Sequence, residues 1–327
     1  MTLLSEIGEK AAVRRIQEII ARRGGRSNIG PGDDAAAIEV GDAYVVITTD
    51  LIAQSTHIVP GMSPWQIGWS LAAINFSDVA AMGAKPLGLL VSMGLTPDMQ
   101  WETLDEILEG ILDCCARINT ELLGGDTKET KELTMVGTAL GRVEKNRILL
   151  RKGASPGDLL AITGSVGLAA AGYQSLRKGL GFRMAEKALL EPQPRVEEGM
   201  MLSSSQVVTS CMDVSDGLAS SVYALSESSG VSFVLEHEEI PVEEMVLEIA
   251  EAVGMDANEL ALYFGGDYQL LFTIKPEGLG KLRSLMGEKF SVIGRAIPKS
   301  SDNVIARGRD IVKLENRGYE HFRKDRR

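Results

Sequence analysis

The segment Gly30-Pro31-Gly32-Asp33-Asp34 is followed, one predicted strand later, by Thr48-Thr49-Asp50. Two adjacent carboxylates come after a Gly-Pro-Gly loop, and a third comes at the end of the predicted strand 44–47. Carboxylates crowded in this way repel one another unless cations neutralise them. Oxygen ligands of this kind suit Mg²⁺, which in turn commonly carries substrate phosphates. The two clusters therefore predict a metal-dependent nucleotide enzyme.

The composition is that of an acidic, soluble globular protein. Of its 327 residues, 44% are hydrophobic and 24% are charged, and the formal net charge is −11. This length allows two domains that each have a core. The negative charge argues against a nucleic-acid partner, because phosphate contacts need a basic face. ATP stays compatible, since acidic side chains can hold the metal ions that hold its phosphates.

Cysteine usage and the N-terminal segment favour a cytoplasmic location. Cys114, Cys115 and Cys211 have neither zinc-site nor disulfide-framework spacing. The first 23 residues carry charges throughout, unlike a signal peptide. No window approaches the ~18 uninterrupted apolar residues of a membrane span. We expect no membrane partner.

The first half alternates predicted helices and strands. Helical spacing marks 4–23, which Gly24-Gly25 should end, and 63–83, where Ser63-Pro64 is typical of an N-cap followed by Pro. Asn75 and Asp78 lie one turn apart in this otherwise apolar helix. Strands are expected over 87–95 and 133–143, and a helix over 101–118, with 124–127 as a glycine turn. The buried stripe of helix 63–83 is expected to comprise Ile67, Leu71, Ile74, Val79 and Met82.

The second half continues this alternation after a turn at 155–158. Strands are expected over 159–163, 207–212, 231–235, 268–274 and 290–297, and helices after 164–167, after 213–217, and over 242–253 and 281–286. We place a boundary near 145–150, which gives an N-terminal domain at 1–148 and a C-terminal domain at 149–327. The pattern predicts an α/β fold with layers of the α+β type.

Five groups of acidic residues recur along the chain, and most stand where a strand or loop ends. Any one of them is explained by turn or cap chemistry, which accounts for many Gly-Asp pairs. Independent caps do not require so many carboxylates at the junctions where α/β scaffolds place ligand-binding groups. The groups are Asp33-Asp34, Asp50, Asp78, Asp126 and Asp213/Asp216.

Several common catalytic motifs are absent from the sequence. There is no Walker A loop, no protein-kinase Gly-rich loop and no Gly-x-Ser-x-Gly elbow. Gly164-Ser165-Val166-Gly167 lacks the spacing of a dinucleotide loop, so we interpret it as a tight turn with at most a helix-dipole affinity for anions.

Taken together, the motifs resemble the thiamine-monophosphate kinase family, in the superfamily of aminoimidazole-ribotide synthetase. The resemblance covers roughly residues 5–322 in family order, and His57 together with the aromatic tail points to the thiamine enzymes. The matching segments are 30–34, 48–50 with His57, 75–84, 124–127, Arg151 with 156–158, 213–217, Asp267-Tyr268 and 318–322.

The resemblance implies transfer of the ATP γ-phosphoryl group to thiamine monophosphate, giving thiamine diphosphate. It implies an aminoimidazole-ribotide synthetase-like fold whose N-terminal sheet-and-helix domain forms a barrel-like homodimer core, beside a C-terminal α/β domain. Asp126 and Arg151 would be catalytic, and Gly125, Asp126, Arg151 and Ser215 would contact ATP. His57 and Tyr319 would contact thiamine monophosphate. The Mg²⁺ ligands would be Asp34, Thr48, Thr49, Asp50, Asp78, Asp126, Asp213 and Asp216.

One departure from the family bears on the acceptor. The family usually has Gly-Gly-Glu-Asp-Tyr-Glu where this chain has Phe264-Gly265-Gly266-Asp267-Tyr268-Gln269. Gly266 stands where a substrate-contacting Glu is expected, and Gln269 replaces a second Glu. Two alternatives stay open: another ATP-dependent enzyme of the superfamily with a different acceptor, and a nucleotide-binding regulator without turnover.

Overall fold

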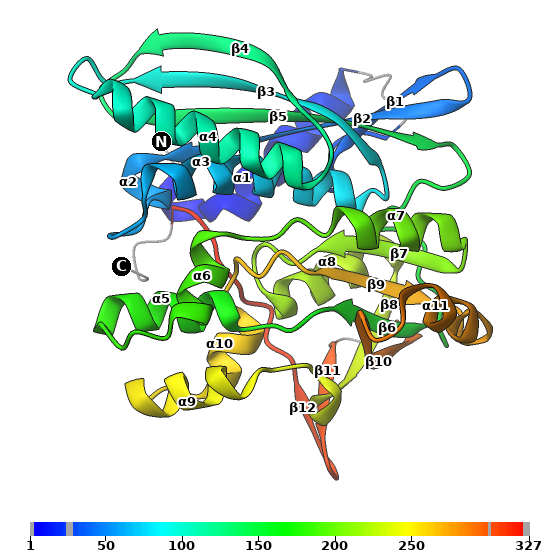
Figure 1. Cartoon of the computed structure of the whole chain (residues 1–327). Coiled ribbons are helices and arrows are strands. Elements are labelled where there is room, and N and C mark those ends of the chain that lie inside the picture. Colours follow the sequence, from blue (N-terminus) through cyan, green and yellow to red (C-terminus); the bar gives the residue numbers. More distant parts are fainter. Residues whose placement is uncertain (1–2, 24–28, 300–301, 323–327) are drawn as a thin grey trace.

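The computed structural model describes residues 3–23, 29–299 and 302–322. Two sheets, each with its own helices, lie one above the other (Figure 1). This arrangement confirms the predicted α/β fold with layers. The predicted helix stop at Gly24-Gly25 lies outside the described residues, and the boundary at 148/149 stays a prediction.

The first half is built on a five-stranded sheet with the order β1-β2-β5-β3-β4. Its strands are β1 (Ala36–Val40), β2 (Ala43–Ala53), β3 (Lys85–Leu95), β4 (Leu122–Glu129) and β5 (Thr134–Glu144). The helices of this half are α1 (Leu4–Arg22), α2 (Gln54–His57), α3 (Pro64–Ala81) and α4 (Trp101–Arg117). α3 and α4 pack together beneath the sheet, with α3 in contact with β2, β3 and β5 (Figure 1).

Two predictions about this sheet are wrong. β2 does not end before Asp50 but continues to Ala53, so that Asp50 pairs with Gly137 inside the sheet. Residues 124–127 are not a turn, because they belong to β4, which pairs in parallel with β3 at the sheet edge. A Cβ on Gly125 would lie 1.7 Å from the Val91 carbonyl oxygen. The glycine that suggested a turn instead permits close strand pairing.

Helix α3 is the element that joins the two halves. The predicted N-cap is confirmed, since the Ser63 hydroxyl accepts a hydrogen bond from the Gln66 N–H (3.2 Å). The predicted buried stripe was too narrow, because 13 of the 18 residues of α3 are buried. α3 contacts the first sheet and α4, and also α7 and β7 of the second half. A helix enclosed in this way must be apolar nearly all round, so its polar residues call for an explanation.

The second half is built on a seven-stranded sheet with the order β12-β11-β8-β10-β6-β9-β7. Its strands are β6 (Leu159–Thr163), β7 (Val208–Asp213), β8 (Val231–Glu236), β9 (Leu270–Ile274), β10 (Phe290–Pro298), β11 (Val304–Arg307) and β12 (Asp310–Lys313). Its α-helices are α5 (Leu168–Lys178), α6 (Arg183–Leu190), α7 (Val196–Ser205), α8 (Leu218–Ser229), α9 (Glu244–Val253), α10 (Ala257–Tyr263) and α11 (Leu279–Met286). Two 3₁₀ helices cover His237–Glu239 and Pro276–Gly278. All five strands predicted here form, whereas α6, α7, α10 and the β11–β12 hairpin were not predicted.

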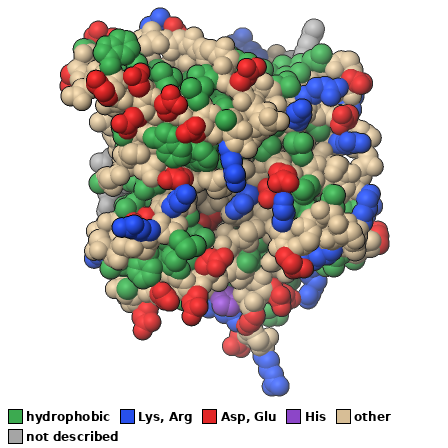
Figure 2. All heavy atoms as spheres, viewed as in Figure 1, with side chains coloured by type: hydrophobic (Ala, Val, Ile, Leu, Met, Phe, Trp, Pro, Cys, Tyr) green, Lys and Arg blue, Asp and Glu red, His purple; other side chains and the backbone are tan. Residues whose placement is uncertain are grey.

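Lys and Arg side chains are scattered among Asp and Glu side chains on the face shown in Figure 2. Of the helices that the structure describes, none combines the length and the apolar character needed to cross a bilayer.

Candidate metal and phosphate site

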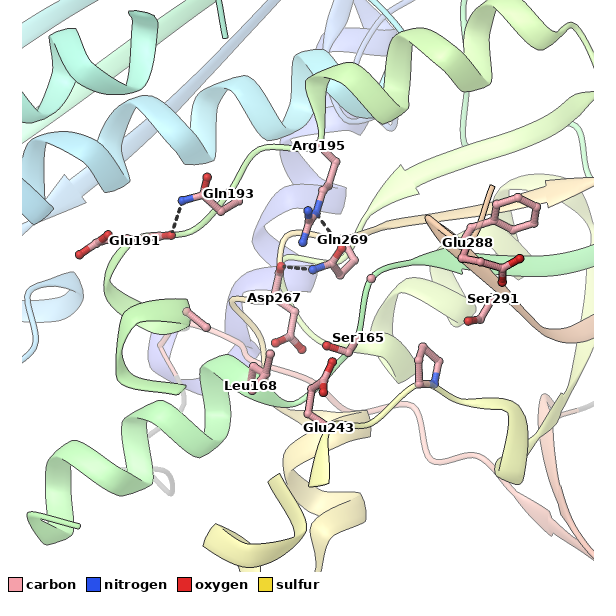
Figure 3. Close-up of a pocket in the computed structure, with 14 residues that line it drawn as sticks. Ser165, Leu168, Glu191, Gln193, Arg195, Glu243, Asp267, Gln269, Glu288 and Ser291 are labelled. Carbon is pink, nitrogen blue, oxygen red and sulfur yellow. Dashed lines mark hydrogen bonds between the residues drawn. The ribbon is translucent and has the colours of Figure 1, made fainter. Parts of the chain in front are cut away.

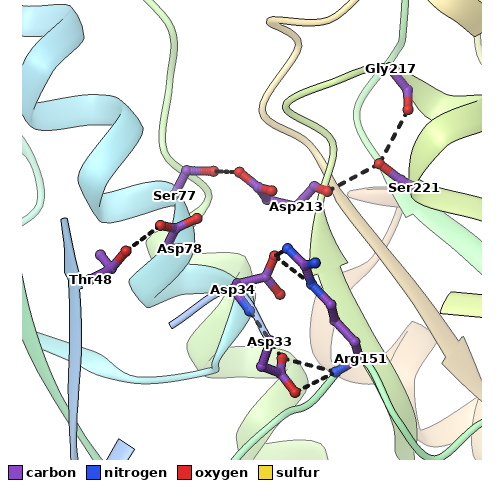
Figure 4. Close-up of polar contacts among 9 residues, drawn as sticks. All are labelled: Asp33, Asp34, Thr48, Ser77, Asp78, Arg151, Asp213, Gly217 and Ser221. Carbon is purple, nitrogen blue, oxygen red and sulfur yellow. Dashed lines mark hydrogen bonds and ion pairs between the residues drawn. The ribbon is translucent and has the colours of Figure 1, made fainter. Parts of the chain in front are cut away.

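Three carboxylates from distant parts of the chain meet where the two halves touch. Asp34 comes from the loop before β1, Asp78 from the last turn of α3, and Asp213 from the end of β7. One ligand oxygen from each lies within 4.8 Å of the others, and the three side chains point toward one another (Figure 4). The cluster therefore draws on both sheets and on the helix between them.

Neighbouring hydroxyls hold two of these carboxylates in place. The Thr48 hydroxyl on β2 donates to Oδ2 of Asp78 (2.5 Å), and the Ser77 hydroxyl donates to Oδ2 of Asp213 (2.7 Å) (Figure 4). Asp50 lies beside Asp78. Its backbone N–H donates to the Asn75 side-chain oxygen (3.0 Å). The polar residues Asn75, Ser77 and Asp78 of α3 are thus accounted for by the cluster.

Arg151 closes one side of the site. Its Nε and Nη2 atoms donate to Oδ1 of Asp34 (3.2 and 2.6 Å), and its backbone N–H donates to Oδ1 of Asp33 (3.1 Å) (Figure 4). The described contacts of the guanidinium use Nε and Nη2, which leaves Nη1 for another partner. An arginine fixed by one carboxylate and aimed at a group of others is suited to meet a phosphate oxygen.

The electrostatics of the cluster call for a cation. Burial, followed by the charge of Asp34, raises the pKa of Asp213 to about 7. Burial and the charges of Asp213 and Asp50 raise the pKa of Asp78 well above its usual range. The Asp34 side chain is 0% exposed, and its Oδ2 atom accepts no hydrogen bond from any described residue. A divalent cation would both neutralise the three carboxylates and supply the missing partner, so these residues fit Mg²⁺.

Asp126 and Thr49 lie on the other face of the first sheet. Across the sheet, four residues lie in one row, and their side chains share a face. The row runs from Asp126 on β4 through Ser92 on β3 and Val136 on β5 to Leu51 on β2. Side chains alternate along a strand, so Asp126, Leu51 and Thr49 share the face opposite that of Thr48 and Asp50. Asp126 is 60% exposed and its carboxylate pairs with Lys128 (3.2 Å). Within one chain, Asp126 and Thr49 do not join the cluster, and Gly125 lies beside Asp126 in the edge strand.

Ser215 and Asp216 follow Asp213 in the turn before α8. The Ser215 carbonyl accepts the Gly266 N–H (2.7 Å), and the Asp216 carbonyl accepts the Tyr319 N–H (3.0 Å). Gly266 has φ +96°, which side chains rarely adopt. The Glu expected at this position would thus be strained in the backbone conformation that this chain has.

His57 and Tyr319 come together through a residue that the sequence did not single out. The His321 ring centroid is 5.3 Å from that of His57 and 4.9 Å from that of Tyr319. Oε2 of Glu9 on α1 accepts a hydrogen bond from the backbone N–H of His321 (2.9 Å). Burial and the neighbouring His321 lower the pKa of His57, whereas Glu9 opposes this shift. An aromatic group with a carboxylate beside it could hold a cationic ring.

Three residues of these two groups were missed as site residues. Ser77 precedes the predicted ligand Asp78, and this neighbour in the sequence was the available signal. His321 stands in the aromatic tail next to the predicted Tyr319. Glu9 gave no signal, because only the docking of α1 against the tail brings it there.

The Asp267 carboxylate is bound at the turn 164–167. Both Asp267 carboxylate oxygens accept hydrogen bonds at the start of α5, from the N–H groups of Gly167 (2.8 Å) and Ala169 (3.1 Å). An internal carboxylate thus occupies the helix end that was expected to have at most a weak affinity for anions.

Comparisons with known proteins agree with this architecture. The model of the AIR synthase related protein N-terminal domain matches residues 32–143, and that of the C-terminal domain matches residues 155–307. Thiamine-monophosphate kinase from Pyrococcus horikoshii is 33% identical over 89% of this chain and 91% of its own length. The Synechococcus elongatus enzyme of the same name is 30% identical over 98% of both chains.

The solved structures point the same way. AaThiL complexed with AMPPCP and TMP superposes with a TM-score of 0.86 at 26% identity, covering 98% of this chain and 99% of that one. HypE from a HypE–HypF complex has a TM-score of 0.73 at 21% identity, covering 92% and 98%, which shows the shared fold alone. The chain belongs to the AIR synthase related family and, within it, to the thiamine-monophosphate kinases.

Proposed function

We propose that this chain is a Mg²⁺-dependent phosphotransferase that moves the γ-phosphoryl group of ATP directly onto thiamine monophosphate. The observation that carries the proposal is the group of Asp34, Asp78 and Asp213, with its orphaned oxygen and Arg151 alongside. The AaThiL structure, which holds AMPPCP and TMP, supports both substrates by its similarity.

The residues of the cluster have a clear task in such a transfer. Asp34, Asp78 and Asp213 would hold Mg²⁺, which when bound neutralises charge on phosphate oxygens. Thr48 and Ser77 fix the orientation of two carboxylates, so the site is organised before substrate arrives. Arg151 offers Nη1 to a phosphate oxygen while Asp34 holds its other two nitrogens. The acceptor phosphate is already ionised, so this chemistry needs no strong general base.

We propose that a second copy of the chain completes the nucleotide site. Leu51 and Leu90 are 45% and 41% exposed on the sheet face that also carries Asp126 and Thr49. Exposed leucines on a sheet face are typical of an interface. A homodimer that buries this face would enclose Asp126, Gly125 and Thr49 between two sheets, as the expected barrel-like core requires. Their ATP and metal roles thus depend on the dimer.

The acceptor end of the site is proposed to be the group of His57, Tyr319 and His321. The Tyr319 ring is half-exposed and is perpendicular to the His321 ring, so part of it is accessible to a ligand. Glu9 lies near both His57 and Tyr319. We propose that Glu9 supplies the carboxylate for the thiamine cation that Gly266 does not.

A phosphoryl-acceptor panel tests this function. Purified protein with ATP and Mg²⁺ is offered thiamine monophosphate, thiamine and other small phosphate esters, and products are separated by chromatography. We expect thiamine diphosphate and ADP in equal amounts from thiamine monophosphate alone. Transfer to a different acceptor would favour another enzyme of the superfamily, and ATP binding without any transfer would favour the regulator.

A further inference from the structure

The second half contains a cavity that the proposed reaction does not use. It has a volume of ≈ 470 Å³, within the range of small-molecule sites. The turn at 164–167, the segment 191–195 and the start of β10 enclose it (Figure 3). Ser165 and Ser291 contribute hydroxyl groups to its lining.

Arg195 lies on one side of this cavity with a neutral partner. Its Nε atom donates to Oε1 of Gln269 (2.8 Å), and it forms no ion pair with any residue that the structure describes. Burial lowers the pKa of Arg195. Gln269 is itself buried and is held by the Thr163 hydroxyl (3.1 Å), so the amide cannot move away. With Gln269 in this position the guanidinium has no ion-pair partner among the described residues, and the charge of Glu198 opposes the effect of burial on its pKa.

Glu243 lies on the other side of the cavity, next to Ser165 (Figure 3). Two other carboxylates of the lining are paired, Glu191 with Lys187 (3.4 Å) and Glu288 with Arg283 (3.3 Å). Glu243 makes no ion pair within the described ranges. Asp267, the remaining carboxylate of the lining, accepts backbone N–H groups at the start of α5. Arg195 and Glu243 thus lack an ion-pair partner among the described residues, and they do not pair with each other.

The walls of this cavity are linked to the metal cluster. The Gln269 carbonyl accepts the Val214 N–H (2.7 Å), next to Asp213 in the chain. The segment 190–192 is bound to α3, because the Ser70 hydroxyl donates to the Leu190 carbonyl (3.0 Å) and the Trp69 indole to the Pro192 carbonyl (2.8 Å). A ligand that touches Gln269 or this segment therefore contacts structure that supports the cluster.

We propose that this cavity is a second small-molecule site, which binds a phosphate-bearing cation between Arg195 and Glu243. Arg195 receives the phosphate with its free guanidinium nitrogens, and the Ser165 and Ser291 hydroxyls supply further donors. Glu243 receives the cationic group. A molecule with both charges satisfies both side chains at once, whereas a simple anion leaves Glu243 unpaired and repelled.

The test is calorimetric titration of the full chain in EDTA without nucleotide. Without divalent cations the acidic cluster repels phosphates, and the cavity variants below distinguish binding in the cavity from binding at the proposed acceptor end. The probes are thiamine diphosphate, which carries both charges, and glycerol phosphate, which carries only the anion. We expect one equivalent of thiamine diphosphate to bind, and about tenfold weaker binding of glycerol phosphate. Neither measurement requires phosphoryl transfer, so the result stands apart from that of the acceptor panel.

Two variants and a control identify the site. Arg195→Met should weaken thiamine diphosphate binding at least tenfold, whereas Arg177→Met, an exposed change on α5, should leave it within about twofold. Glu243→Gln, an exposed change that leaves the fold intact, should weaken thiamine diphosphate binding and strengthen glycerol phosphate binding, because the repulsion of the anion is removed. Absence of thiamine diphosphate binding in EDTA, or equal binding by wild type and both cavity variants, would overturn the proposal.

Discussion

At the scale of single residues, the site depends on three buried carboxylates that cannot all be ionised without a cation. Replacing Asp213 by Asn keeps the Ser77 hydrogen bond and removes one charge. The Asp213→Asn variant should unfold in EDTA at the same temperature as wild type or higher, because repulsion is relieved. Added Mg²⁺ should no longer raise that temperature, and kcat should fall about 10³-fold, roughly 4 kcal/mol.

Thermal unfolding with EDTA or Mg²⁺, paired with product assays, checks this expectation. Asp105→Asn, an exposed change on α4, is the matched control and should behave as wild type. A Mg²⁺ shift of wild-type size in Asp213→Asn would contradict the metal assignment.

Glu9 offers a separate residue-scale test at the acceptor end. Glu9→Gln removes the carboxylate near His57 and Tyr319 but keeps a hydrogen-bond acceptor for the His321 N–H. We expect KM for thiamine monophosphate to rise about tenfold, with kcat and KM for ATP within about twofold. Steady-state kinetics measure both, and Glu18→Gln on the same helix serves as control. A fall in kcat without a change in KM would rule out the acceptor role of Glu9.

At the scale of elements, strand β5 and helix α3 must approach closely for the site to form. A Cβ at Gly137 would lie 2.3 Å from Nδ2 of Asn75, whose side-chain oxygen accepts the Asp50 N–H. Gly137→Ala should therefore displace Asn75 and the part of β2 that carries Asp50. We expect at least a tenfold loss of kcat/KM and about 1–3 kcal/mol of destabilisation from overpacking.

Activity assays and denaturant unfolding measure the two effects. Gly280→Ala in α11 is the control, because no atom lies within 4 Å of the added Cβ. This change should be neutral or stabilising, by about 0.5–1 kcal/mol. Normal activity in Gly137→Ala would show that the contact between Gly137 and Asn75 does not organise the site.

Elements that follow simple periodicity were predictable, and those that depend on neighbours were not. Strand β6 and helix α3 match the sequence prediction because apolar runs and the Ser63-Pro64 start are local signals. β4 was mistaken for a turn, because its pairing with β3 depends on a parallel neighbour more than 30 positions away. α6, α7 and the β11–β12 hairpin were missed because these elements are short, with 8, 10, 4 and 4 residues.

At the scale of the whole molecule, we predicted from the sequence that all the acidic groups share one site. The folded single chain brings only some of them together. Asp34, Asp78 and Asp213 converge, whereas the alternation along β2 and β4 puts Thr49 and Asp126 on the opposite face. The alternation was not applied from the sequence, because 48–50 and 124–127 were not predicted to be strands. The proposed dimer accounts for this second group.

Charging the exposed sheet face tests that dimer. Leu90→Arg should convert a dimer to a monomer, because burying an unpaired arginine in the interface is costly. If Asp126 acts only when the dimer encloses it, loss of the dimer should also lower the transfer activity. Light scattering measures the oligomeric state and product assays measure the transfer. Leu247→Arg, at an exposed position of α9, is the control. An active wild-type monomer would contradict the interface and its share in the nucleotide site.

The most direct test of the central claim is a crystal structure with Mn²⁺, in place of Mg²⁺, and AMPPCP, using anomalous scattering to locate the metal. We predict an anomalous peak bound by Asp34, Asp78 and Asp213, including Oδ2 of Asp34, with Arg151 next to a nucleotide phosphate. Bound nucleotide with no anomalous peak among these three carboxylates would contradict it.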